Sequence, residues 1–139
     1  MRTAPIFVDS NVFLYAAGED HPLKEPCGAV VRRVASGEIA ATTSTEVVQE
    51  VLHVLARRGR REDGIRLCRG ILGLFDEVLP VTGEDMSLTC DIAGRYSGIT
   101  IRDAVHAATL MGRGLGRILS ADRHFDAIEE IVRVDPSEI

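Results

Sequence analysis

The sequence has little cysteine, and the cysteines it has are poorly arranged for cross-links or metal binding. The 139 residues include Cys27, Cys68 and Cys90, an odd number without C-x-x-C spacing. This argues against both a disulfide framework and a cysteine-based zinc site. We expect the three thiols to be buried or idle.

Long apolar runs are also missing. No stretch is apolar for long enough to cross a membrane, and the start of the chain lacks a basic segment followed by a long apolar one. We therefore expect a cytoplasmic protein with no membrane partner. Proline is scarce, while 45% of the residues are hydrophobic and 27% are charged. This composition argues against disorder and indicates a single folded domain over residues 1–139.

Excess positive charge is absent. The formal net charge is −5, which counts against a nucleic-acid partner. Local patches nevertheless steer ligands whatever the net charge. One basic cluster is present, formed by Arg57, Arg58, Arg60, Arg61, Arg66 and Arg69. Such a cluster is also typical of a solvated helix end, because cations favour the carboxyl end of a helix.

Several common catalytic motifs are missing too. The chain has no H-E-x-x-H metal motif, no G-x-S-x-G turn and no glycine-rich loop between a strand and a following helix. His106 and His124 lie near acids in the sequence, and we interpret them as bordering or packed residues rather than as metal ligands.

Apolar runs typical of strands alternate with amphipathic segments typical of helices. We predict strands at 6–9, 39–42, 77–81, 116–120 and 131–134, and helices or helical turns at 11–17, 24–36, 45–58, 62–75, 83–96, 100–112 and 123–129. This alternation predicts a parallel sheet wrapped by helices, an α/β fold.

Two of the predicted strands end directly at acids. The run 6–8 leads into Asp9, and the run 118–119 leads to Ser120 and Asp122. Ligands bind at the carboxyl ends of the strands in open α/β sheets. Each acid also has a local interpretation, because an Asp can cap the helix that follows it.

Two further acids lie on predicted helices. In STEVVQEVLHVL, residues 44–55, Glu50 lies nearer the edge of the apolar stripe than Glu46 does. Glu50 is therefore the better candidate for a partly buried carboxylate, with a surface acid paired along the helix as the alternative. In TIRDAVHAATL, Asp103 follows Thr100 at the spacing of a capping box, and the helix dipole there stabilises a carboxylate.

Taken together, FVDSNVFLYA, STEVVQEVLHVL, TIRDAVHAA and ILSADRHFDAI resemble the PIN-domain nucleases, in particular the toxin ribonucleases of the VapC type. The match follows the family's order over nearly the whole chain. The resemblance implies a three-layer α/β/α sandwich around a parallel sheet of about five short strands. It also implies a homodimer and an antitoxin partner whose segment covers the site. By this resemblance the metal-binding acids are Asp9, Glu50, Asp103 and Asp122, with Asn11 and Ser120 as polar neighbours and Asp126 as a minor candidate.

This implied site makes chemical sense. Four converging carboxylates repel one another, and a divalent cation removes that conflict. Oxygen ligands select a hard ion, Mg²⁺ or Mn²⁺, which can activate water and neutralise charge on a phosphodiester. The hypothesis is hydrolysis of RNA, with Arg57, Arg58 and Arg102 holding the flanking backbone.

Three alternatives remain open. The first is a PIN-type ribonuclease in RNA processing rather than a toxin. The second is a non-catalytic α/β binding module whose acids serve only as helix caps. The third is a phosphatase acting on small molecules, but the D-x-D-x-T signature of haloacid-dehalogenase-like phosphatases is absent because residue 11 is Asn.

Overall fold

The computed structural model describes residues 4–139. Its strands are β1 (Ile6–Val8), β2 (Ala41–Ser44), β3 (Val78–Leu79), β4 (Arg117–Leu119) and β5 (Val132–Val134). Its α-helices are α1 (Ser10–Ala17), α2 (Lys24–Ala35), α3 (Thr45–Arg57), α4 (Arg61–Leu74), α5 (Gly83–Arg95) and α6 (Ile101–Met111), and two 3₁₀ turns follow, η1 (Arg123–Ala127) and η2 (Pro136–Glu138).

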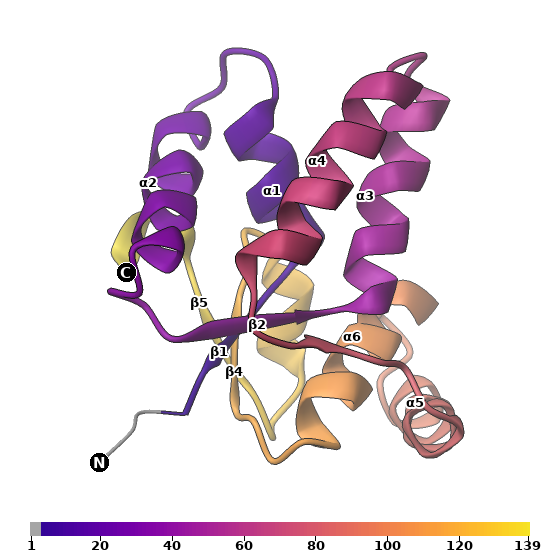
Figure 1. The fold of residues 1–139 in the computed structure, drawn as a ribbon. Helices are drawn as coiled ribbons and strands as arrows, with labels where there is room; N and C mark the ends of the chain where they lie inside the picture. The colour runs from indigo at the N-terminus through magenta and orange to yellow at the C-terminus, as the bar shows by residue number, and fades with distance from the viewer. Residues whose placement is uncertain (1–3) are drawn as a thin grey trace.

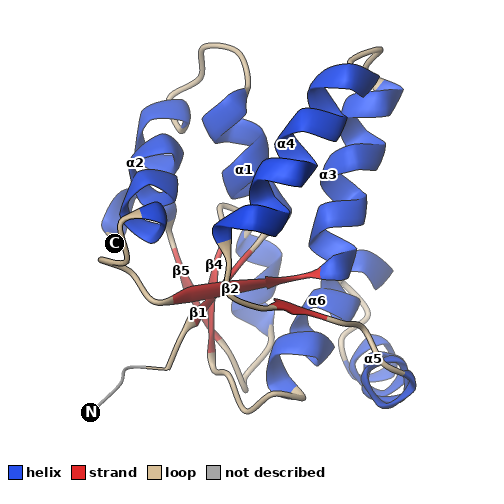
Figure 2. Cartoon of the chain, in the orientation of Figure 1, coloured by secondary structure: helices blue, strands red, loops and turns tan. Residues whose placement is uncertain are grey.

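The five strands form one sheet in the order β3-β2-β1-β4-β5, and every neighbouring pair is parallel. Helices α1 to α4 lie on one side of this sheet and α5 and α6 on the other (Figures 1 and 2). The expected three-layer α/β/α sandwich with a parallel sheet is therefore confirmed.

The central strand explains the first apolar run of the sequence. Ile6, Phe7 and Val8 are all buried, because helices cover both faces of the sheet and neighbouring strands lie on both sides. A strand covered on both faces is apolar throughout rather than alternating. Ile118 and Leu119 of the adjacent β4 are buried for the same reason.

Two strands differ from their predicted positions. β2 lies two residues further along than predicted and has the polar sequence Ala-Thr-Thr-Ser. Its buried hydroxyls are satisfied by backbone carbonyls: Thr43 donates to Val8 at 2.8 Å and Thr42 to Glu77 at 3.1 Å. Apolarity does not reveal such a strand. β3 is limited to two residues, shorter than the predicted 77–81.

Cys27 and Cys68 are buried free thiols, and Cys90 is an exposed one. Within residues 4–139, no helix combines the length and the apolarity that crossing a bilayer requires.

Candidate active site

The acids meet at the edge of the sheet where β1 and β4 end. Asp9 directly follows β1 and caps α1, accepting a hydrogen bond from the Ser10 amide at 2.8 Å. Its own amide donates to the carbonyl of Leu119, the last residue of β4. Asp9 is only 3% exposed, so it is both a helix cap and a buried carboxylate at the junction of two strands.

Ser120 and Asn11 join the ends of these strands. The Ser120 hydroxyl donates to Asp9 Oδ2 at 2.6 Å and accepts from the Asn11 side chain at 3.1 Å and from the Asp122 amide at 3.0 Å. Asn11 also donates to Asp9 Oδ2 at 3.1 Å and accepts from the Ala121 amide at 3.2 Å. One donor and two acceptor positions use the full capacity of a hydroxyl. This network fixes Asp9 against the loop that carries Asp122.

Glu50 reaches the same place from α3. Its Oε1 lies 3.0 Å from Nε2 of the fully buried His106, which is also 3.8 Å from Asp9 Oδ1. Its Oε2 lies 3.7 Å from the guanidinium of Arg102. Burial raises the pKa of Glu50, but hydrogen bonding with His106 and Ser10, followed by the charges of His106 and Arg102, outweighs burial and brings the pKa below its usual value.

Asp103 and Asp122 form the other half of the cluster. Asp103 lies in the first turn of α6, capped by Thr100, and Asp122 caps η1. Ligand atoms of Asp103, Asp122 and His124 lie within 4.8 Å of one another. Burial, followed by the charges of Asp9 and Asp122, raises the pKa of Asp103 to about 7. The carboxylates thus repel one another across the whole cluster.

The structure brings the predicted quartet and its two polar neighbours together. The capping interpretation is also correct for Asp9 and Asp122, since each bonds a local amide while facing the cluster. Asp126 is engaged elsewhere, because Arg133 donates to both of its oxygens, at 2.9 and 3.3 Å.

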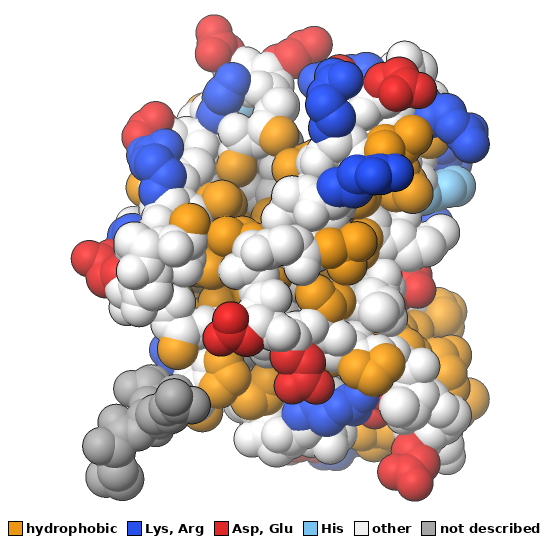
Figure 3. Space-filling view, in the orientation of Figure 1, with side chains coloured by type: hydrophobic (Ala, Val, Ile, Leu, Met, Phe, Trp, Pro, Cys, Tyr) orange, Lys and Arg blue, Asp and Glu red, His pale blue; other side chains and the backbone are white. Residues whose placement is uncertain are grey.

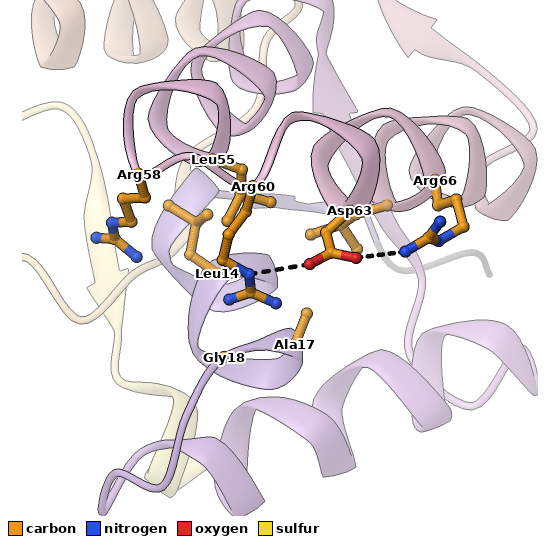
Figure 4. A pocket seen from close by; sticks show the side chains of 9 residues that line it. Leu14, Ala17, Gly18, Leu55, Arg58, Arg60, Asp63 and Arg66 are labelled. Atoms are coloured by element: carbon orange, nitrogen blue, oxygen red, sulfur yellow. Dashed lines mark hydrogen bonds and ion pairs between the residues drawn. The ribbon is translucent and has the colours of Figure 1, made fainter.

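The arginines predicted for substrate binding lie in different places. Arg102 is beside Glu50, whereas Arg57 ends α3 and Arg58 follows it, about 12 Å further along the helix axis than Glu50. Arg58 lines a pocket of about 200 Å³ between the end of α1 and the α3–α4 hairpin (Figure 4). Basic side chains, drawn blue, gather over this end of the hairpin, where the sequence has only arginines (Figure 3).

Two residues contribute to the site beyond the sequence-based assignment. His106 was expected to border or pack, and it lies between Glu50 and Asp9. The sequence analysis did not identify Arg133 of β5. This side chain donates to the backbone carbonyl of Ser120 at 3.0 Å and so holds the loop between β4 and η1. The spacing of His106 three residues after Asp103 was the available signal, and none marked Arg133.

The donors of this cluster fit a hard divalent cation. The candidate ligand atoms form two groups, Asp9, Glu50 and His106 in one and Asp103, Asp122 and His124 in the other. The charge of Asp9 acts on Asp103, so the two groups are neighbours, and together they offer four carboxylates. Oxygen ligands of this kind suit Mg²⁺ or Mn²⁺. Burial raises the pKa of Asp103 most, and the charges of Asp9 and Asp122 raise it further; a cation would relieve this repulsion between the carboxylates.

Comparison with known proteins gives consistent results. The sequence pattern of the PIN domain matches residues 6–131. A Mycobacterium bovis protein named VapC ribonuclease Mb1869c is 35% identical over 129 residues, 93% of this chain and 98% of the relative. The crystal structure of Mycobacterium tuberculosis VapC20, named a sarcin–ricin loop cleaving toxin, has a TM-score of 0.73 at 19% identity and covers 91% of this chain and 96% of its own. A toxin–antitoxin complex from Klebsiella pneumoniae has a TM-score of 0.68 at 15% identity, with coverages of 96% and 99%.

Proposed function

Because this chain belongs to the PIN domain family, we propose that it is a metal-dependent endoribonuclease and the toxin of a toxin–antitoxin pair. A relative named as a ribonuclease supports RNA hydrolysis, and the similar toxin–antitoxin complex supports the pairing. The observation that carries the proposal is the gathering of Asp9, Glu50, Asp103 and Asp122, from four separate stretches of sequence, at one edge of the sheet.

These four acids would hold Mg²⁺ or Mn²⁺. When bound, the ion makes a water more acidic and neutralises negative charge on the phosphodiester. The protein's own contribution is to hold the oxygens in place beforehand. Ser120 and Asn11 fix Asp9 Oδ2, and Thr100 fixes the start of the helix that carries Asp103. Ligands held in advance need little rearrangement during the reaction.

Asp103 and Arg102 have further roles in this proposal. With a pKa near 7, Asp103 can hold a proton when the carboxylates are uncompensated and release it when a cation binds. Arg102 is 48% exposed beside Glu50, so its guanidinium can contact a phosphate next to the bond that is cut.

Arg57 and Arg58 are proposed to hold RNA backbone further from the acids. In Figure 4, Arg60 and Arg66 both pair with Asp63, whereas no ion pair engages Arg58 within residues 4–139. Its positive charge is therefore available for a phosphate at the mouth of the pocket.

The Arg58→Gln protein is expected to show a three- to tenfold higher KM for RNA with kcat unchanged. Loss of one phosphate contact should also reduce the slope of log KM against log salt by about 0.7. Steady-state cleavage at several salt concentrations measures both quantities. Arg69→Gln, in the same basic cluster but outside the pocket, is the matched control. Equal effects of the two substitutions would contradict a specific contact at Arg58.

Cleavage of RNA by the purified protein tests the proposed activity. We expect endonucleolytic products with Mg²⁺ or Mn²⁺ and none after EDTA. EDTA-insensitive cleavage would exclude the metal mechanism, and intact RNA under all conditions would favour a binding module. If the acids served only as helix caps in a binding module, Mn²⁺ should leave the melting temperature of the protein unchanged.

We propose that the protein is a homodimer that acts on RNA in the cytoplasm, and that a segment of an antitoxin covers its acids.

The effect of expression on growth distinguishes a toxin from an RNA-processing enzyme. Expression without a partner should halt growth if the protein is a toxin. Unchanged growth with an active enzyme would favour the RNA-processing role.

A further inference from the structure

His106 is a fully buried imidazole whose two ring nitrogens have very different surroundings. Nε2 lies 3.0 Å from Glu50 Oε1 and 3.8 Å from Asp9 Oδ1. Nδ1 has no hydrogen-bond partner among the described residues. The ring also packs against Phe7, at 6.2 Å between ring centroids. A polar ring in this position is close enough to the acids either to join them as a ligand or to support them.

Whether His106 is a metal ligand or a support for the acids can be argued from the surroundings of Nδ1, which has no hydrogen-bond partner among the described residues. As a cation ligand, Nε2 must present a lone pair, and the neutral ring then carries its hydrogen on Nδ1. That hydrogen would be buried without an acceptor, which proteins strongly avoid. Histidines that bind metals normally donate the second N–H to a carboxylate, carbonyl or water. In every other protonation form, Nε2 carries a hydrogen and can donate it to Glu50.

We propose that His106 is a positioning residue that holds Glu50 by a hydrogen bond from Nε2, and that it is not a ligand of the cation. This inference rests on the proposed metal-dependent function and assigns a role to a side chain outside the acidic quartet. The bond fixes Oε1 of Glu50 from the buried side, while Oε2 faces the exposed Arg102. Glu50 lies on a long helix, and the bond from His106 holds its Oε1 at 3.0 Å. Without it, the carboxylate would have more rotational freedom.

Substitution of His106 separates the two roles through metal affinity. His106→Leu keeps a buried apolar side chain but removes the donor, and His106→Gln keeps an N–H donor on a flexible chain. We expect His106→Leu to weaken both Mg²⁺ and Mn²⁺ binding by a similar factor, about ten- to a hundredfold. The His106→Gln protein should regain most of this affinity. In RNA cleavage, His106→Leu should lower kcat about tenfold or more at saturating metal, with KM for RNA unchanged.

Calorimetric titration of each protein with Mg²⁺ and with Mn²⁺ measures the affinities. A loss in His106→Leu that is much larger for Mn²⁺ than for Mg²⁺ would overturn the proposal, because it would identify a nitrogen ligand. Unchanged affinity and unchanged kcat would also overturn it, because the ring would then serve packing alone.

The unmodified protein provides a test that does not depend on the variants folding. Nitrogen NMR of the imidazole should show Nε2 protonated both before and after saturation with Mg²⁺. Loss of the Nε2 hydrogen on saturation would overturn the proposal. A parent protein that binds neither ion would overturn the metal site and this inference together, whereas a parent that binds metal without cutting RNA would contradict only the proposed activity.

Discussion

The Asp103→Asn protein is expected to lose RNA cleavage almost completely, with kcat at least about a hundredfold below that of the parent protein. Asn has nearly the same shape but cannot supply the negative charge that a cation needs. The fold should be kept, because the metal-free parent already holds a proton on Asp103 below pH 7 and the neutral amide resembles that form. Steady-state cleavage assays and thermal melting measure the two properties.

Substitutions of the other acids sharpen this test. Asp9→Asn should reduce cleavage as strongly, although it also disturbs the bonds from Ser120 and Asn11. On α3, Glu50→Gln should be inactive, while Glu46→Gln in the first turn of the same helix should remain active. Full activity of Asp103→Asn would exclude the proposed site. An inactive Glu46→Gln beside an active Glu50→Gln would show that the wrong acid of α3 had been assigned.

The metal-free protein is expected to become less stable as pH rises from about 4 to 8. The pKa of Asp103 is about 7 in the folded protein and near 3.8 in the unfolded chain. Between these values the folded state binds the extra proton, so the free energy of unfolding falls as pH rises. For the coupled acids taken together, this loss is on the order of a few kcal/mol.

Divalent metal should reverse this trend. A cation binds the ionised carboxylates, so its affinity and its stabilising effect should both grow with pH. Melting temperatures measured from pH 5 to 8, with EDTA and with Mn²⁺, test the expectation. The gain from Mn²⁺ should be larger at pH 8 than at pH 5.5, and Asp103→Asn should show a weaker pH dependence and little gain. A gain that is equal at all pH values would contradict the coupling between proton and metal.

Much of this arrangement could be predicted from the sequence. The apolar run at 6–8 is visible because a central strand is covered on both faces. Asp9 and Asp122 stand out by their positions just after strands. The choice of Glu50 over Glu46 rests on helical periodicity together with the resemblance of Q-E-V-L to the helix of PIN-domain nucleases. The functional roles of these acids remain a proposal, since periodicity places a side chain without showing what it binds.

Other parts could not be predicted, for physical reasons. The prediction placed β2 two residues too early, because the strand is polar and gives no apolar signal. Its buried threonine hydroxyls donate hydrogen bonds to carbonyls 35 residues away in the sequence. His106 lies in a helix that is buried along nearly its whole length, so periodicity does not distinguish the face that meets Glu50. Arg133 reaches Ser120 only because β5 pairs with β4, a contact that no local pattern encodes.

The strand order also bears on when the acidic cluster can form during synthesis of the chain. Phe7 pairs with Thr42 of β2 on one side and with Ile118 of β4 on the other. Strand β1 can therefore pair on both sides only after β4, more than a hundred residues later in the sequence, has been translated. Asp122 emerges later still. The four acids of the proposed site therefore cannot come together in the nascent chain until residue 122 has been translated.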